Sequence, residues 1–138
     1  MVERAAHPHR FFTAEEKREI VEAIRAAEKN TTGEIRIHLD RKGGGDVMDR
    51  AKRIFHRQRM HRRKHRNGVL IYLSLADRSF AVLGDEAIHQ RVGDSFWKEI
   101  TQAMQQHFSS GQFLEGLKQA IREIGESFQK HFALPATP

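Results

Sequence analysis

The apolar run 68–75, GVLIYLSL, limits the folds open to this chain more than any other segment. A strand with one covered face alternates apolar and polar residues, whereas a strand covered on both faces is apolar almost throughout. The run is too short to cross a membrane, which takes about twenty apolar residues. We therefore expect a central strand with protein layers on both faces, in a chain of 138 residues that has the length of one domain.

Two further segments have the pattern of strands. Segment 34–40 alternates Ile35, Ile37 and Leu39 with polar residues, which is the period of a strand covered on one face. Segment 79–84, SFAVLG, follows the apolar run after the short turn ADR, which predicts a hairpin. A sheet of three strands is the result.

Four helices are predicted from caps and from apolar residues at helical spacing. Thr13 and Glu16 form a capping box that opens a helix over 14–29. Asp46 caps a second helix after a glycine loop, Asp94 opens a third, and the fourth follows the turn 109–112. The apolar stripes contain Ile20, Val21, Ile24 and Ala27, then Val47, Ala51, Ile54 and Phe55, then Phe96, Trp97, Ile100, Met104 and Phe108, and finally Phe113, Leu117, Ile121, Ile124 and Phe128.

The order of these elements fixes the topology. A right-handed crossover through the second helix makes segments 34–40 and 68–75 parallel, and the hairpin makes 79–84 antiparallel to 68–75. The predicted fold class is α/β, a three-layer α/β/α sandwich with a small mixed β-sheet.

The composition limits the kinds of site and the cellular locations that we expect for the protein. The chain has no cysteine, which excludes disulfides and cysteine-based zinc or redox sites. Its first twenty residues mix acids, bases and histidines without the apolar stretch of a signal peptide. No later segment reaches the eighteen apolar residues of a membrane span. We expect a cytoplasmic location.

The positive charge of the chain comes from one segment. Residues 50–66 contain nine bases and no acid, while the other fifteen bases face all eighteen acids, a balance of −3. The segment matches no standard nucleic-acid-reading motif and contains one aromatic residue, so sequence-specific recognition is not indicated. It is either a solvated helix end or a contact for an anionic partner. The bases expected to make such a contact are Arg50, Arg53, Arg57, Arg62, Arg63 and Arg66.

Acidic residues should gather at one edge of the sheet. Parallel strands end at the same edge, which places Asp40, the glycine loop and Asp77 there, and ligands of open α/β sheets favour this edge. Asp46 and Asp49 open the helix that leaves the loop. Crowded carboxylates repel one another, and Ca²⁺ or Mg²⁺ relieves that repulsion. The predicted metal ligands are Asp46, Asp49, Asp77 and Asp40; the alternative is that these acids serve only as helix caps and turn residues.

Other candidate sites have less support. The loop RKGGGD lacks the Lys-Ser/Thr ending of a phosphate-binding P-loop. His61 and His65 share a helical spacing, but no HExxH motif accompanies them, and the surrounding bases would repel a dication. Residues 84–86 end the antiparallel strand at the opposite edge, where we expect a turn and a helix start.

Three blocks of the sequence resemble the TPM domain, a family named for a thylakoid-lumen phosphatase, a photosystem II repair protein and a modulator of acetylcholine receptors. The blocks are TTGEIRIHL, RNGVLIYLSLADRSFAVLGDEAIH and FSSGQFLEGLKQAI. Three other stretches, GDVMDRAKRIF, MHRRKHRNGVLIY and VGDSFWKEI, are similar to the stand-alone soluble bacterial branch of that family. The resemblance covers about 11–132, which we expect to form a single domain, and we expect 1–10 and 133–138 to be flexible termini.

The resemblance also bears on chemistry. The family is associated with Ca²⁺ or Mg²⁺, and Asp46, Asp49 and Asp77 occupy matching acidic positions; phosphatase activity is claimed for some members. This chain departs from the pattern where members show GYGLE, because it has GDEAIH at 84–89, and Gln112 stands in a turn that is more acidic elsewhere. We expect a divalent-cation-binding module, with a metal-assisted phosphatase and an adaptor for an anionic partner as alternatives.

Overall fold

The computed structural model describes residues 4–135. Three strands form one sheet in the order β1-β2-β3, in which β1 and β2 are parallel and β2 and β3 antiparallel. The elements are α1 (Ala14–Glu28), β1 (Glu34–Asp40), α2 (Val47–Arg57), the 3₁₀-helix η1 (Met60–Arg62), β2 (Gly68–Ser74), β3 (Ser79–Gly84), α3 (Glu86–Ser109) and α4 (Phe113–His131). The predicted order, pairing and fold class are confirmed.

The central strand β2 is buried along its whole length, as its apolar sequence predicts. Because side chains alternate across a sheet, it feeds two separate cores. Val69, Ile71 and Leu73 belong to the larger core, and Leu70 and Tyr72 belong to the smaller one. The strand thus joins both outer layers of the sandwich.

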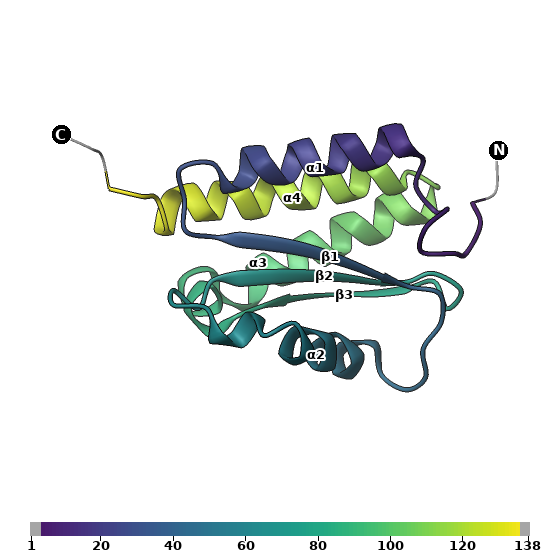
Figure 1. Cartoon of the computed structure of the whole chain (residues 1–138), viewed down its shortest axis with the longest axis horizontal. Coiled ribbons are helices and arrows are strands. Elements are labelled where there is room, and N and C mark those ends of the chain that lie inside the picture. The colour runs from purple at the N-terminus through teal and green to yellow at the C-terminus, as the bar shows by residue number, and fades with distance from the viewer. Residues whose placement is uncertain (1–3, 136–138) are drawn as a thin grey trace.

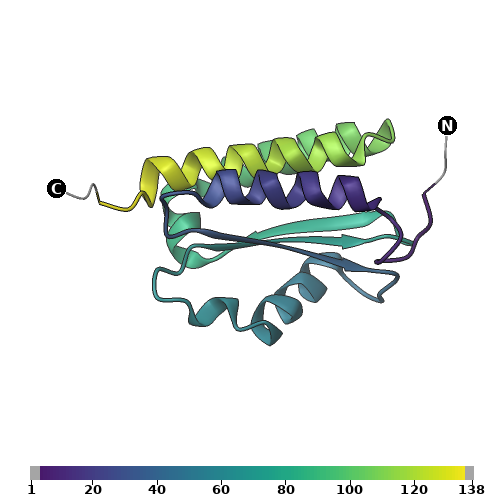
Figure 2. The same cartoon turned by 45° about the horizontal axis from the view of Figure 1, so that its top comes forward.

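The two outer layers differ in size. Helix α2 and η1 cover one face of the sheet alone, and α1, α3 and α4 lie on the other (Figure 1). The second view shows the same division, with α2 and η1 set apart from the remaining helices (Figure 2). One face of the molecule is therefore made almost entirely by the segment that carries the basic run.

Helix α3 begins earlier than its apolar stripe predicts, in the segment 84–86 where a turn and a helix start were expected. Asp85 caps its start by accepting a hydrogen bond from the Glu86 N–H at 2.8 Å. The expected start at Asp94 instead marks a break inside the helix, because Gly93 has the non-helical angles φ 77° and ψ 174°. Such angles are open almost only to glycine, so the sequence Gly-Asp resembles a helix boundary although helical structure precedes it.

Both ends of the described chain contact the helical layer. Arg4 pairs with Glu16 of α1, and the Leu134 N–H donates to the Asn30 carbonyl at 2.8 Å. Of the termini expected to be flexible, residues 1–3 and 136–138 lie outside the described residues. Among residues 4–135, no helix combines the length and apolar character that a membrane crossing requires.

Candidate functional site

The carboxyl ends of β1 and β2 lie side by side, as their parallel pairing requires. Asp40 and Ser74 are register partners at the ends of the two strands. Beyond them, the Leu75 N–H donates to the Asp40 carbonyl at 2.9 Å and the Ala76 N–H donates to the Arg41 carbonyl at 2.7 Å. These bonds hold the glycine loop against the turn that contains Asp77.

Asp77 lies at the centre of this edge. Its Oδ2 atom accepts hydrogen bonds from the Ser74 hydroxyl at 2.7 Å and from the Gly43 N–H at 3.2 Å. The Arg50 guanidinium donates to the same oxygen at 3.3 Å. These three donors, Ser74 foremost, hold the pKa of Asp77 below its ordinary value. The carboxylate is therefore ionised at neutral pH, while its Oδ1 accepts no hydrogen bond from the described residues.

Arg50 supplies the positive charge beside Asp77. In the sequence it belongs to the basic run that we expected to face a partner, but its side chain is only 8% exposed. It donates to the Ser74 hydroxyl at 3.2 Å, and its guanidinium carbon lies 5.7 Å from the centre of the Tyr72 ring. A side chain at Gly43 would overlap the guanidinium, so the glycine makes room for it. The buried Nε of Arg50 has no partner among the described residues.

Asp40 belongs to a second polar group on the α2 side of the sheet. Its Oδ2 accepts from the Tyr72 hydroxyl at 2.7 Å, and its Oδ1 lies 2.9 Å from His38 Nε2. The rings of His38 and Tyr72 stack with centroids 5.9 Å apart. Burial, followed by the bond to Asp40, raises the pKa of Tyr72 to about 12. The phenol therefore stays protonated and donates to the carboxylate.

Asp46 and Asp49 open α2 in the positions that helix N-termini favour. Asp46 is the N-cap and accepts from the Asp49 N–H at 3.1 Å. Both side chains are exposed. Within residues 4–135, no three histidine or acidic side chains are grouped so that they could hold a metal ion. The four predicted ligands thus share one region of the molecule without forming a preformed metal cluster.

An open groove of about 520 Å³ lies next to this edge. It is lined by Val47 and Met48 of α2, by the turn residue Arg78 with the first residues of β3, and by polar side chains of α3 that include Gln102 and Gln105. The end of α3 also returns to this side, because the Phe80 and Phe108 rings pack 5.2 Å apart. A ligand held at Asp77 would therefore have an accessible surface beside it.

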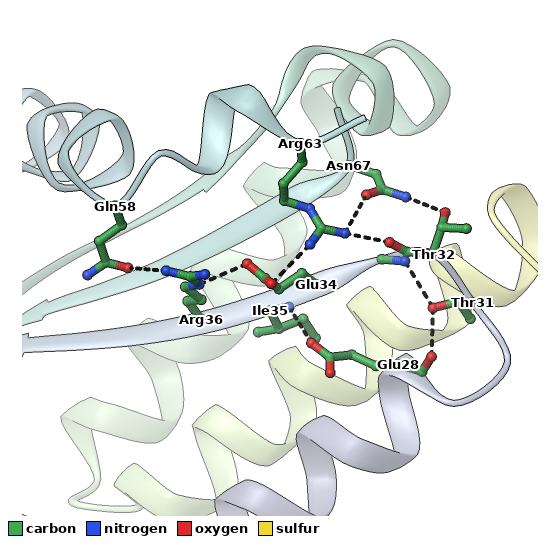
Figure 3. A network of polar contacts seen from close by, with 10 residues as sticks. Glu28, Thr31, Thr32, Glu34, Ile35, Arg36, Gln58, Arg63 and Asn67 are labelled. Carbon is green, nitrogen blue, oxygen red and sulfur yellow. Dashed lines mark hydrogen bonds and ion pairs between the residues drawn. The ribbon is translucent and has the colours of Figure 1, made fainter. Parts of the chain in front are cut away.

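The remaining bases of the basic run divide into exposed and tethered side chains. Arg53, Arg57 and Arg62 are exposed. Arg63 is drawn onto β1, where it donates to Glu34 Oε2 at 3.0 Å and to the Thr32 carbonyl at 2.6 Å (Figure 3). Arg66 forms an ion pair with Asp85. Arg63 and Arg66 are therefore paired with acids, although the Arg66 side chain is still 37% exposed.

The sequence analysis did not place Arg50, His38 or Tyr72 at this edge. Arg50 lies three residues after Val47 and four before Ile54, on the apolar stripe of α2, so helical spacing could have indicated its burial, but its partner Asp77 lies 27 residues away. His38 and Asp40, in contrast, are two residues apart on a strand and so point to the same face. His38 is also the register partner of Tyr72. The strand pattern and the predicted parallel pairing could therefore have placed His38 and Tyr72 beside Asp40.

The comparisons with known proteins agree with this architecture. The chain is 45% identical to the BA42 protein from the psychrophilic bacterium Bizionia argentinensis, whose NMR structure it matches with a TM-score of 0.84 over 91% of this chain and 86% of that one. The N-terminal domain of a protein from P. gingivalis has the same fold at 16% identity, with a TM-score of 0.70 over 92% of this chain and 83% of that one. No curated protein matches the sequence.

The family comparison covers nearly the whole domain. The model of the TPM domain matches residues 7–127, which include all three layers of the sandwich and the edge around Asp77. The resemblance seen in the three sequence blocks is thereby confirmed. This chain belongs to the TPM domain family.

Proposed function

We propose that this TPM domain binds a divalent cation, Ca²⁺ or Mg²⁺, through the acids at the carboxyl edge of its sheet. One observation carries the proposal: Asp77 is held ionised through Oδ2 alone, which leaves Oδ1 to a ligand. The glycine loop tethered to Asp77 leads directly to the exposed Asp46 and Asp49. Asp40 adds a carboxylate at the same strand end. Ca²⁺ and Mg²⁺ prefer such oxygen ligands.

The glycine loop supplies the movement that this site needs. No atom lies within 4 Å of the position where a side chain would begin at Gly44 or Gly45, and Gly45 has a φ of 75°. A loop with this freedom can bring Asp46 toward Asp77, while Asp49 approaches from the first turn of α2, and carbonyls of the loop can complete the coordination. The proposal therefore includes a closure of the loop around the ion.

Thermal unfolding tests cation binding directly. The protein is treated with EDTA and heated with and without Ca²⁺ or Mg²⁺ at fixed ionic strength. A cation that binds only the native state raises its free energy of unfolding by about 2.7 kcal/mol at a hundredfold excess over Kd. We expect Asp49→Asn and Asp77→Asn to reduce the rise in unfolding temperature, because both remove a charge and keep the size of the side chain.

The matched control is Glu126→Gln, which removes an exposed acid from α4 and should respond to the cation as the wild type does. A wild-type protein with no cation response contradicts the proposal. An undiminished response in both aspartate variants contradicts the assignment of these residues.

A metal-assisted phosphatase is a second candidate, favoured by the buried guanidinium beside Asp77. A cation at the edge would polarise a phosphoryl oxygen and activate water, and Arg50, whose Nε lacks a partner, would stabilise negative charge. Arg78 lines the adjacent groove. Hydrolysis of a small phosphomonoester should then require Ca²⁺ or Mg²⁺ and fall in Asp46→Ala but not in Glu126→Gln. Hydrolysis that persists equally in EDTA and in Asp46→Ala, or no hydrolysis at all, counts against this activity.

A further inference from the structure

The outer face of α2 and η1 carries a concentrated set of bases. The apolar side of this segment packs on the sheet through Ala51, Ile54, Phe55 and Met60, all buried. The bases lie at the intervening positions and point away from that core. We call the exposed bases of this face the α2 surface: Lys52, Arg53, Arg57, Arg59, Arg62 and Lys64.

The charges of the α2 surface are not neutralised within residues 4–135. The three other bases of the run pair with acids, namely Arg50 with Asp77, Arg63 with Glu34 and Arg66 with Asp85. No base of the α2 surface forms an ion pair with a described residue. No acid occurs between residues 50 and 66, and the rest of the chain has a balance of −3. The molecule is therefore cationic on its single-helix face and mildly acidic elsewhere.

We infer that the α2 surface docks on the phosphate backbone of double-stranded nucleic acid, without reading its sequence. Four of its six bases are arginines, whose planar guanidinium matches phosphate oxygens in pairs. Lys52, Arg53 and Arg57 lie in the last six residues of α2, and Arg59, Arg62 and Lys64 follow in and around η1. A duplex presents one phosphate charge for about every 1.7 Å of its axis. Six bases gathered on one compact face can therefore contact several phosphates at once.

The same residues argue against other modes of binding. Single strands are held by stacking of bases on exposed aromatic rings, but Phe55, the one aromatic residue between 50 and 66, is 4% exposed. Asn67, which could read a base edge, is buried. Gln58 contacts Arg36 (Figure 3) and also His38. Insertion into a lipid surface would need the apolar side of α2, which the sheet already covers. These residues therefore favour contacts to phosphate over contacts to bases.

Fluorescence anisotropy with a labelled duplex of arbitrary sequence tests the inference. EDTA is present throughout, so that the result does not depend on the proposed cation site. Binding should be independent of sequence and weaken about a thousandfold between 50 and 200 mM monovalent salt if all six bases contact phosphates. The triple variant Arg53→Gln, Arg57→Gln and Arg62→Gln should lower the slope of log affinity against log salt by about 3.

The control variant changes the net charge by the same amount, but in the helical layer on the other face of the sheet. Arg18→Gln, Lys98→Gln and Arg122→Gln remove three exposed bases from α1, α3 and α4, and duplex binding should change little. The inference is overturned if this control weakens binding as much as the α2 variant does. It is also overturned if no duplex binds, or if a single strand, polyglutamate or anionic vesicles bind more tightly than the duplex.

Discussion

Tyr72 is the only tyrosine of the chain and is fully buried, so that one titration reports on one site. Burial and the bond to Asp40 raise its pKa from 10.0 to about 12. We predict that tyrosinate absorbance of the native protein appears near pH 12. Unfolded chains lose the same proton near pH 10, so the free energy of unfolding contributed by this group falls as pH rises from 10 to about 12.

Circular dichroism of the same samples separates titration of the native state from unfolding. Asp40→Asn removes the carboxylate that holds the phenol, and it should move the absorbance midpoint toward pH 10. A wild-type midpoint near 10 in a protein that is still folded would show that the hydroxyl of Tyr72 is not enclosed as described.

Glu28 is a carboxyl group whose charged form is disfavoured in the folded protein. Its Oε2 accepts from the Ile35 N–H at 2.7 Å, but burial raises its pKa above the ordinary value, with a smaller contribution from Glu34. The unfolded chain then ionises first, so this group reduces stability as pH rises above about 4.5. We predict that Glu28→Gln keeps the acceptor and raises the free energy of unfolding at pH 7 by less than about 1 kcal/mol.

Urea unfolding at pH 7 measures this difference. Glu28→Ala is the informative partner variant, because it removes the charge together with the acceptor and leaves the Ile35 N–H without its bond. That variant should be less stable than the wild type by about 1 kcal/mol. If glutamine were as destabilising as alanine, the charge of Glu28 would be favourable, contrary to the pKa shift.

At the scale of elements, the contact between α1 and α4 depends on a small residue. A Cβ atom at Gly125 would lie 2.7 Å from the Cβ of Ala27 and 2.8 Å from its Cα. Alanine improves helix propensity by about 1 kcal/mol, but overpacking costs about 1–3 kcal/mol. We predict that Gly125→Ala lowers the free energy of unfolding by about 1 kcal/mol, as measured by urea unfolding.

A second substitution can separate the two effects. Ala27→Gly removes the atom that the new Cβ would meet most closely, so Gly125→Ala should cost less in the Ala27→Gly background than in the wild type. Gly44→Ala, in a loop with open space around it, should be neutral or slightly stabilising. A stabilising effect of Gly125→Ala alone would mean that the helices separate without cost.

The elements most open to prediction from sequence were those whose pattern follows from two-sided burial or from a cap. The run in β2 required layers on both faces, and Thr13 with Glu16 fixed the start of α1. The start placed at Asp94 was wrong because Gly93 resembles a helix end, whereas the helix start expected at residues 84–86 is confirmed. A single positive φ inside a helix depends on how the two halves pack, which the local sequence does not specify.

The candidate site was predictable only as far as topology determines it. Parallel strands predicted that Asp40 and the Asp77 turn would share an edge. The burial of Arg50 was predictable from its place on the apolar stripe of α2 between Val47 and Ile54, but its pairing with Asp77, 27 residues away, was not. Long-range ion pairs of this kind follow from the assembled fold rather than from any local pattern.

At the scale of the whole molecule, Arg4 connects the segment before α1 to two helices. Its guanidinium donates to both carboxylate oxygens of Glu16 at 2.7 Å and to the Phe11 carbonyl at 2.8 Å. It also lies over aromatic rings, 5.4 Å from the centres of Phe11 and Phe12 and 5.7 Å from that of Phe113, the first residue of α4. A single cation thus connects the segment before α1 to α1 and to the start of α4.

The ion pair between Arg4 and Glu16 should make the fold sensitive to acid. The hydrogen bond from Arg4, with smaller contributions from Thr13, lowers the pKa of Glu16 from 4.5 to about 2. Because the pKa is depressed in the native state, the stabilisation is complete above pH 4.5 and is lost as pH falls toward 2. We expect a contribution of about 1–2 kcal/mol, since solvent still reaches and screens the pair.

Glu16→Gln isolates the charge from the helix cap, because glutamine can still accept the hydrogen bond from the Thr13 N–H. In urea unfolding across this pH range, the variant should be less stable than the wild type at pH 7 and lose less stability in acid, so that the two curves converge near pH 2. Glu15→Gln, an exposed acid in the same helical turn, should follow the wild-type curve. Parallel curves for the wild type and Glu16→Gln would mean that the acid response arises elsewhere and that Arg4 does not secure the helical layer through Glu16.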